Sequence, residues 1–209
     1  MNTTPALPYI DPHKLIGHDA NGEVYSGRVT RTGRLLDVLN PQPDQIDILD
    51  ITSGLAYQCR FTGQTSRFYS IAAHSLLVSY LVPEDIALYG LLHDASEAYL
   101  NDISRPVKLQ LGPEYKKMEA LVQQAIFDRF GLGDCGVPAV VKQADNVAVC
   151  LEQKFLLPDV PAWPHALTDA EASAILKDFG LEYEDFDSTP DEQGTLFLTR
   201  FRELYHGKV

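Results

Sequence analysis

Apolar residues recur with the three-to-four-residue spacing of amphipathic helices over most of the chain beyond residue 45. One segment, residues 84–100, is apolar nearly all round, which is typical of a helix buried on every side. The pattern predicts helices over residues 46–58, 68–82, 84–100, 113–130 and 138–157.

Two further helices are indicated by their start signals. The segments Thr168–Glu171 and Thr189–Glu192 both match the capping box, in which a threonine and a glutamate three residues later satisfy each other's backbone N–H groups. Pro190 falls at a first helical position, where its missing N–H costs nothing. Gly180 ends the first of these helices, and the second runs to about Tyr205.

The N-terminal part of the chain has a different character. Residues 1–22 are punctuated by proline and glycine and predict an irregular arm, whereas β-branched residues around the Arg31-Thr32-Gly33 turn predict a short β-hairpin over residues 24–39. The chain is therefore expected to be mostly α. We divide it into an arm and hairpin over 1–45, a helical core over 46–157, and C-terminal helices over 158–209 packed on the core.

Charge narrows the classes of partner. The 209 residues carry 17 Lys and Arg against 29 Asp and Glu, a formal net charge of −12. Residues 158–192 alone hold ten acids and one lysine, a net −9, which leaves −3 for the rest. This acidity argues against a polymeric nucleic acid, which is bound through a basic excess, but not against a single nucleotide.

Nothing in the sequence indicates a membrane or an oxidising compartment. The longest apolar stretch, Ile86–Leu92, is far shorter than the roughly 20 residues of a membrane span. Residues 1–12 lack the features of a signal peptide. The three cysteines, Cys59, Cys135 and Cys150, form no CxxC pair, so we expect reduced thiols in a cytoplasmic protein.

Candidate chemistry lies where ionisable residues interrupt the apolar pattern. His93, Asp94 and Glu97 lie within the 84–100 segment, and His74 and Asp145 lie within apolar stretches of two other helices. A single buried histidine is usually a hydrogen-bonded core residue, but buried carboxylates need a partner or a metal, and this set predicts a metal site. His93 and Glu97, four residues apart, would share a helix face, with Glu97 beside the metal for acid–base chemistry.

Mixed nitrogen and oxygen donors suit a divalent transition metal, namely Co²⁺, Mn²⁺, Zn²⁺, Ni²⁺ or Fe²⁺, better than the all-oxygen cage typical of Mg²⁺. Coordination positions left open by such a site can bind water and lower its pKa.

The order His74, His93-Asp94, Asp145 resembles the motif of the HD superfamily of metal-dependent phosphohydrolases. A wider string is similar to the 5′-deoxynucleotidase branch of that superfamily and to phage-type deoxynucleoside triphosphate triphosphohydrolases. The resemblance covers about residues 46–157 and implies an HD-domain helical bundle. The string comprises Cys59-Arg-Phe, Ile71-Ala-Ala-His74-Ser, Leu92-His-Asp-Ala-Ser-Glu97-Ala and Asp102-Ile-Ser-Arg-Pro-Val-Lys108.

The resemblance implies roles by position. The two histidines and two aspartates of the motif would be the metal ligands, and Glu97, together with Asp94, would be catalytic. The substrate-binding residues would be Arg60 at the phosphate, Phe61 and Asp102 at the sugar, and Lys108 and Lys142 along the phosphate chain. Phe61 stands where those nucleotidases usually carry a tryptophan. Phe61 as a core residue, Asp102 as a turn cap and the lysines as surface charges are the alternatives.

We expect hydrolysis of the 5′-phosphoester of a small deoxynucleotide, by a homo-oligomeric enzyme. A triphosphate would give deoxynucleoside and triphosphate, and a monophosphate would give deoxynucleoside and phosphate; both reactions break the same bond. The alternatives are a hydrolase of another nucleotide, such as a guanosine tetraphosphate or cyclic nucleotide, a non-enzymatic nucleotide sensor, and an interaction protein that docks through its acidic C-terminal region.

Overall fold

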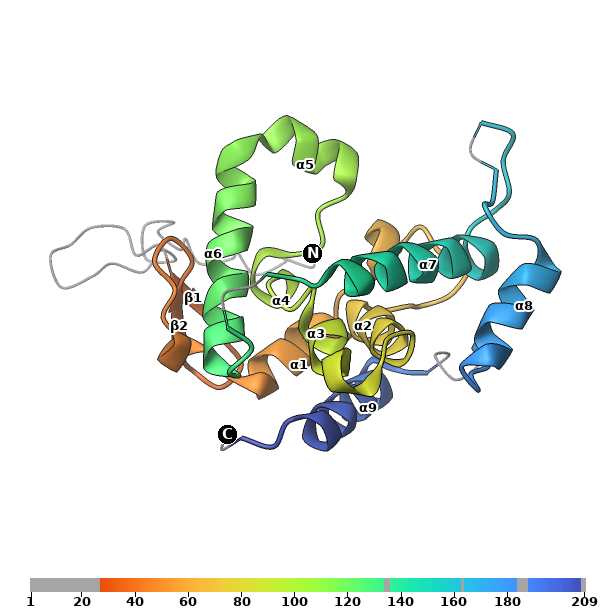
Figure 1. The fold of residues 1–209 in the computed structure, drawn as a ribbon. Helices are drawn as coiled ribbons and strands as arrows, with labels where there is room; N and C mark the ends of the chain where they lie inside the picture. The colour runs from red at the N-terminus through yellow and green to blue at the C-terminus, as the bar shows by residue number, and fades with distance from the viewer. Residues whose placement is uncertain (1–26, 134–135, 163, 184–187, 208–209) are drawn as a thin grey trace, which may run out of the picture.

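The computed structural model describes residues 27–133, 136–162, 164–183 and 188–207. This part of the chain is a helical bundle with one small antiparallel hairpin at its N-terminal end, which confirms the predicted fold class (Figure 1). The predicted irregular arm over residues 1–22 lies outside the described residues. Cys59 and Cys150 are free thiols, and Cys135 also lies outside the described residues.

The hairpin pairs β1 (Gly27–Val29) with β2 (Leu35–Asp37), with Arg28 opposite Leu36. Gly33 takes a φ of 84° in the connecting turn, a conformation that glycine adopts without steric cost. The buried Asp50 carboxylate accepts hydrogen bonds from the Thr32 backbone N–H at 2.7 Å and the Thr32 hydroxyl at 2.8 Å. These two bonds attach the hairpin turn to the first helix.

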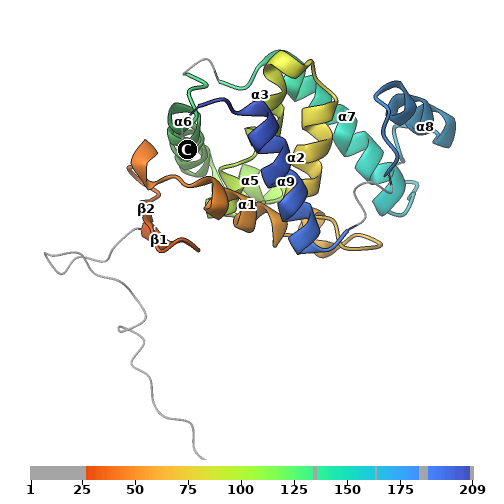
Figure 2. The ribbon, with the colours of Figure 1, turned by 90° about the horizontal axis from the view of Figure 1, so that it is seen from below.

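The centre of the bundle is α2 (Ile71–Tyr80), in which every residue from Ile71 to Ser79 is buried. The Ser70 hydroxyl begins this helix by accepting a hydrogen bond from Ala73 N–H. Its neighbours surround it in both views (Figures 1 and 2). They are α1 (Ile48–Ala56), α3 (Ala87–Leu92), α7 (Ala139–Leu156) and α9 (Pro190–Leu204).

The helix α4 (Glu97–Leu100) packs directly on α1 because α1 has a glycine at the contact. A Cβ atom built on Gly54 would lie 2.7 Å from the Ala98 Cβ and from the Ala98 carbonyl oxygen. Only a glycine permits that approach, and the approach fixes the position of Glu97 at the start of α4.

The single helix predicted over residues 84–100 is wrong. Gln123 on α6 (Pro113–Arg129) explains the interruption. Its Nε2 donates to the Leu92 carbonyl at 2.7 Å, and its Oε1 accepts from Ser96 N–H at 3.1 Å. These are the two groups that would bond to each other in a continuous helix, so the inserted side chain opens the ladder. His93 thus begins a turn and Glu97 begins the helix that follows it, so the two residues do not lie along one helix. The segment consists of a short 3₁₀ turn at Glu84–Ile86, then α3, a turn over 93–96, and α4.

A helix that the apolar pattern does not predict, α5 (Arg105–Leu111), precedes α6. Pro106 in its first turn is a helix-start signal, and Gly112 at a φ of 79° ends it. It projects from the bundle together with the first turns of α6 (Figure 1). Lys108 is the only residue of α5 that is not exposed, so this side chain connects α5 to the rest of the molecule.

The C-terminal helices begin where the capping boxes predict. In α8 (Asp169–Asp178) and in α9, the capping threonine and the glutamate three residues later satisfy each other's backbone N–H groups, and Pro190 opens α9. The helix α8 lies against α7, where Lys154 and Asp169 form a 2.6 Å ion pair, and α9 packs on α1, α2 and α3. The division of the chain into three parts stays a prediction. No helix of the described chain has the length and apolar character needed to cross a membrane.

Candidate functional site

Four side chains from three places in the bundle converge on one point. His74 comes from α2, His93 and Asp94 from the turn after α3, and Asp145 from α7. The two histidine Nε2 atoms are 3.3 Å apart. Asp145 Oδ1 lies 3.2 Å from His74 Nε2, and Asp94 Oδ2 lies 3.2 Å from His93 Nε2 and 3.6 Å from His74 Nε2.

The outer nitrogen of each imidazole is held by an oxygen that can only accept. His93 Nδ1 lies 2.8 Å from the Gly90 carbonyl oxygen, and His74 Nδ1 lies 2.6 Å from the carboxylate of Glu152. Both Nδ1 atoms therefore carry a proton, and in the neutral rings both Nε2 atoms direct a lone pair into the cluster. With both rings neutral, the cluster consists of two imidazole lone pairs and two carboxylate oxygens, a donor set that would bind a cation.

A divalent metal fits this donor set. Ligand atoms about 2.1 Å from one ion lie about 3.0 to 3.4 Å from each other in octahedral or tetrahedral arrangements. The atoms of His74, His93 and Asp145 are 3.2 to 3.9 Å apart, and Asp94 Oδ2 lies 3.2 and 3.6 Å from the two Nε2 atoms, so these separations are within about 0.5 Å of that range. The residues present would thus hold a metal with little rearrangement.

Without a metal, protons compensate the carboxylates. Burial and Arg60 would lower the pKa of His74, but Glu152 and Asp145 outweigh them and raise the pKa to about 9. Burial would raise the pKa of Asp94, but the histidines and Arg60 hold it well below its usual value. The pKa of Asp145 is also lowered, chiefly by His74, although burial would raise it. The site favours ionised aspartates facing positive charge.

Arg60 lies beside the cluster in a loop of unusual conformation. Its Nε donates to Glu152 Oε2 at 3.2 Å, and its Nη1 is 3.8 Å from Asp94 Oδ2. The next residues, Phe61 and Thr62, have φ values of 53° and 56°, in the left-handed region that non-glycine residues seldom occupy. Such strain persists only where surrounding contacts impose it, and it is concentrated at functional sites.

Glu97 presents an unsatisfied oxygen at the same place. Its Oε1 accepts from Lys108 Nζ at 3.1 Å, whereas its Oε2 is buried and has no hydrogen-bond partner among the described residues. Burial, Asp94 and Asp102 raise the pKa of Glu97 well above its usual value, against the opposing effect of Lys108. A buried carboxyl that carries a proton and lacks a partner is suited to donate that proton to a ligand.

A cavity of about 230 Å³ opens between the cluster and α6. His93, Asp94 and Glu97 form one wall, and Lys108, Glu119 and Gln123 form the other. Lys108 Nζ spans it, 3.1 Å from Glu97 Oε1 and 2.7 Å from Glu119 Oε1. A ligand in this cavity would touch two of the candidate metal ligands and Glu97.

The remaining predicted residues are placed unequally. Phe61 is half-buried, with the Arg60 guanidinium 5.5 Å from its ring centroid. Asp102 is half-buried and acts electrostatically on Arg60 and Glu97, while its backbone N–H donates to Gln58. Lys142 is exposed on α7 and makes no ion pair with any residue that the structure describes. The structure therefore brings Lys108 to the site and leaves Lys142 at its margin.

Three contributors were not predicted: Glu152, Glu119 and Gln123. Glu152 had a visible signal, because it lies two helical turns after Asp145 on an apolar helix face and is fully buried. Glu119 and Gln123 lie on a polar surface helix and carry no comparable signal in the sequence. Their roles depend on where α6 packs.

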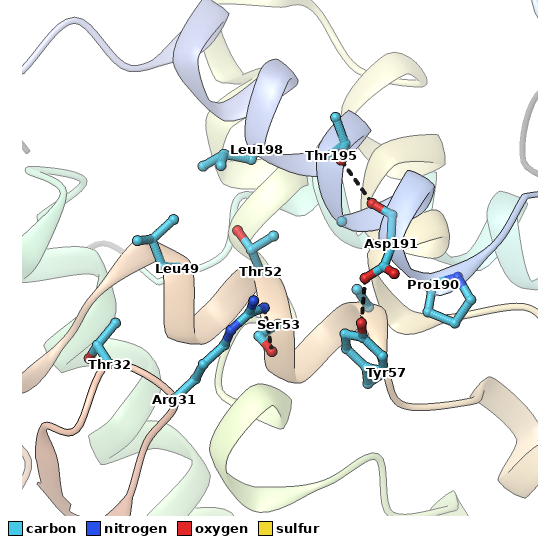
Figure 3. Close-up of a pocket in the computed structure, with 12 residues that line it drawn as sticks. Arg31, Thr32, Leu49, Thr52, Ser53, Tyr57, Pro190, Asp191, Thr195 and Leu198 are labelled. Atoms are coloured by element: carbon cyan, nitrogen blue, oxygen red, sulfur yellow. Dashed lines mark hydrogen bonds between the residues drawn. The ribbon is translucent and has the colours of Figure 1, made fainter.

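A second cavity, of about 480 Å³, lies between the hairpin turn, α1 and α9 (Figure 3). Arg31 bonds to Ser53 at its centre, and Tyr57 donates to Asp191 at its edge. None of the predicted site residues lines it. The candidate site is therefore the smaller cavity at the His and Asp cluster.

Two proteins named 5′-deoxynucleotidase are distantly similar to part of this chain. A 5′-deoxynucleotidase of Vibrio atlanticus is 31% identical in an alignment 120 residues long, which covers 40% of this chain and 62% of that protein. The 5′-deoxynucleotidase YfbR of Salmonella paratyphi B is 37% identical in an alignment 90 residues long, which covers 34% of this chain and 45% of that protein. These partial matches support an HD-superfamily phosphohydrolase, the class to which the helical bundle and its His and Asp cluster point.

More similar relatives cover most of the chain. The uncharacterized protein YfdR of Escherichia coli K12 is 43% identical over 162 residues, which are 77% of this chain and 85% of that protein. An uncharacterized protein of Rhodobacter capsulatus is 40% identical in an alignment 133 residues long, which covers 58% of this chain and 68% of that protein. The chain belongs to the family of YfdR. No protein-family model matches it.

Proposed function

We propose that this protein is a metal-dependent phosphohydrolase that cleaves the 5′-phosphoester of deoxynucleotides. The main support is that two imidazole Nε2 atoms and two carboxylates converge beside a buried arginine and the unpartnered Oε2 of Glu97. The partial similarity to proteins named 5′-deoxynucleotidase supports the same substrate class.

The donor set of His74, His93, Asp94 and Asp145 would hold a divalent transition metal. When bound, such an ion lowers the pKa of water and offsets charge on phosphoryl oxygens. Mixed nitrogen and oxygen donors favour Co²⁺, Mn²⁺, Zn²⁺, Ni²⁺ or Fe²⁺ over Mg²⁺.

The chain's own groups would divide the remaining work. Arg60, charged and fixed by Glu152, would bind the phosphoryl oxygens and stabilise their developing charge. Asp94 would orient the attacking water. Glu97 would protonate the leaving 5′-oxygen from its unpartnered Oε2. Lys108 would then stabilise the resulting Glu97 carboxylate by an ion pair. Phe61 and Asp102 would bind the sugar.

The test is a panel of nucleotides with purified protein and Co²⁺ or Mn²⁺. We expect each active deoxynucleotide to give its deoxynucleoside, together with phosphate from a monophosphate or triphosphate from a triphosphate. Guanosine tetraphosphate and cyclic nucleotides belong in the panel, since their preferential hydrolysis would replace the proposed substrate class. A protein that binds nucleotides but hydrolyses none would be a sensor.

The matched variants are Asp94→Ala and Asp85→Ala. Loss of Asp94 should abolish metal-dependent turnover, whereas Asp85 is exposed in the 3₁₀ turn before α3 and does not line the cavity, so its loss should leave turnover intact. Turnover retained by Asp94→Ala would refute the site assignment.

The length of the phosphate chain needs its own test. Lys108 borders the cavity, and Lys142 lies one turn before Asp145 on α7. We propose that both meet a longer phosphate chain, so that Lys108→Ala and Lys142→Ala reduce triphosphate hydrolysis far more than monophosphate hydrolysis. Equal losses would reject this part of the proposal. A homo-oligomeric state and a cytoplasmic location remain predictions.

A further inference from the structure

We propose that Glu152 is a positioning residue that holds His74 and Arg60 in their working orientations with one carboxylate. The inference rests on the proposed function only in taking His74 as a metal ligand and Arg60 as a phosphate-binding residue. Glu152 lies on α7, is fully buried, and belongs to none of the sequence motifs that indicated the site.

Each carboxylate oxygen has a different task. Oε1 accepts from His74 Nδ1 at 2.6 Å, and Oε2 accepts from Arg60 Nε at 3.2 Å. The first bond keeps the His74 proton on Nδ1, which leaves Nε2 free to bind an ion. A carboxylate behind a metal-binding histidine acts in this way in other metalloproteins, by fixing ring orientation and raising ligand basicity.

The second bond fixes the direction of the arginine. The bond from Nε to Glu152 restricts rotation of the guanidinium, and Nη1 lies 3.8 Å from Asp94 Oδ2 at the cluster. An arginine fixed in this way loses little further freedom when it binds an anion.

The geometry favours this role over that of a general structural ion pair. Asp145 and Glu152 are seven residues apart on one helix, and they reach opposite nitrogens of the same imidazole, Nε2 at 3.2 Å and Nδ1 at 2.6 Å. The ring is thus held between a candidate ligand and a supporting group from the same face of α7.

The experiment compares the parent protein with Glu152→Gln and Glu152→Ala by Co²⁺ titration. Removing the carboxylate should weaken Co²⁺ binding about 10- to 100-fold, the usual effect of losing a group that supports a metal ligand. Glutamine can accept from His74 Nδ1 but then turns its NH₂ group toward Arg60 Nε–H, so we expect a smaller loss of Co²⁺ affinity and a clear loss of affinity for inorganic phosphate.

A spectroscopic readout separates positioning from stability. In the Zn²⁺-loaded parent, the His74 Nδ1 proton should give a downfield, slowly exchanging imidazole resonance; Glu152→Gln should move it upfield, and Glu152→Ala should abolish it. Leu151→Ala is the matched control, because Leu151 is the preceding and equally buried residue of α7. It should lower the thermal midpoint but leave Co²⁺ affinity and the resonance unchanged.

Wild-type Co²⁺ affinity and an unchanged resonance in both Glu152 variants would overturn the inference. So would a loss of affinity in Leu151→Ala equal to that in Glu152→Ala, since the effect would then be one of stability. A parent protein that binds Co²⁺ but hydrolyses no nucleotide would refute the proposed function and leave the Glu152 result standing. A parent that binds no Co²⁺ would refute both.

Discussion

Replacing Gln123 tests the interruption that gives the site its shape. The side-chain amide lies between the Leu92 carbonyl at 2.7 Å and the Ser96 N–H at 3.1 Å, and it holds open the turn that carries His93 and Asp94. In Gln123→Ala the Ser96 N–H loses its partner, whereas the Leu92 carbonyl keeps a second hydrogen bond, from Ala95 N–H at 3.1 Å.

The size of the effect follows from the burial of these groups. Leu92 is fully buried and Ser96 is 6% exposed. A buried backbone group left without a hydrogen bond costs about 1–3 kcal/mol, and here this applies to the Ser96 N–H alone. Gln123 lines the cavity, so water can enter where the amide was, and we expect the lower half of that range, about 1–2 kcal/mol.

The assay is urea denaturation combined with Co²⁺ titration. Gln124→Ala is the matched control, since the neighbouring amide bonds to exposed Asp128, and its loss should change the free energy of unfolding by about 0.5 kcal/mol or less. Gln123→Glu keeps an acceptor for Ser96 but sets a carboxylate against the Leu92 carbonyl oxygen, so it should be at least as unstable as Gln123→Ala.

One competing response must be distinguished. If Ser96 N–H instead bonds to the Leu92 carbonyl, the segment becomes a regular helix, the free energy of unfolding changes by less than about 1 kcal/mol, and Asp94 moves away from His74. Co²⁺ affinity would then fall while stability is nearly kept. A Gln123→Ala protein that matches the parent in both measurements would refute the reasoning.

Two further predictions concern packing and charge. Gly54→Ala should lower the free energy of unfolding by about 1–3 kcal/mol, because the added Cβ would lie 2.7 Å from Ala98. Gly194→Ala should cost far less, because its added Cβ would lie 3.3 Å from Ala56 Cβ. Urea denaturation of the two variants measures the difference, and equal losses of stability would contradict the prediction. Glu84→Gln should lower stability by at most about 1 kcal/mol at pH 7. The hydrogen bond from Arg200 lowers the pKa of Glu84, so the stabilisation is present above its ordinary value of 4.5 and is lost as the pH falls through the lowered value; a difference between variant and parent that grows in acid would contradict this.

The parts of the fold that follow from local rules were predictable. Capping boxes specify the starts of α8 and α9 because their hydrogen bonds span only three residues. The apolar periodicity gave α1, α2, α6 and α7 with errors of a few residues at the ends. The break at residues 93–96 was not predictable, because it depends on an amide from 27 residues further along the chain.

The candidate site shows the same division between local and distant contacts. The His, His-Asp and Asp positions stand out as ionisable residues within apolar helices, which is a local signal. The exposed apolar residues of α5, Val107, Leu109 and Leu111, gave no helical pattern, and so neither that helix nor the Lys108–Glu119 ion pair was predicted.

The two histidines of the cluster differ in how they are held, and this difference bears on when the site forms. His93 Nδ1 donates to the carbonyl of Gly90, three residues away, so α3 orients this ring by itself. His74 Nδ1 donates to Glu152, 78 residues away on α7, and His74 Nε2 faces Asp145, which also lies on α7. Both sides of the His74 ring therefore become ordered only when α7 docks against α2. Because a ligand that binds the folded form stabilises it, a metal held by this cluster would stabilise the docking of α7 in particular. Adding Co²⁺ should therefore slow hydrogen exchange of the α7 amides, and this measurement tests the site without a substrate.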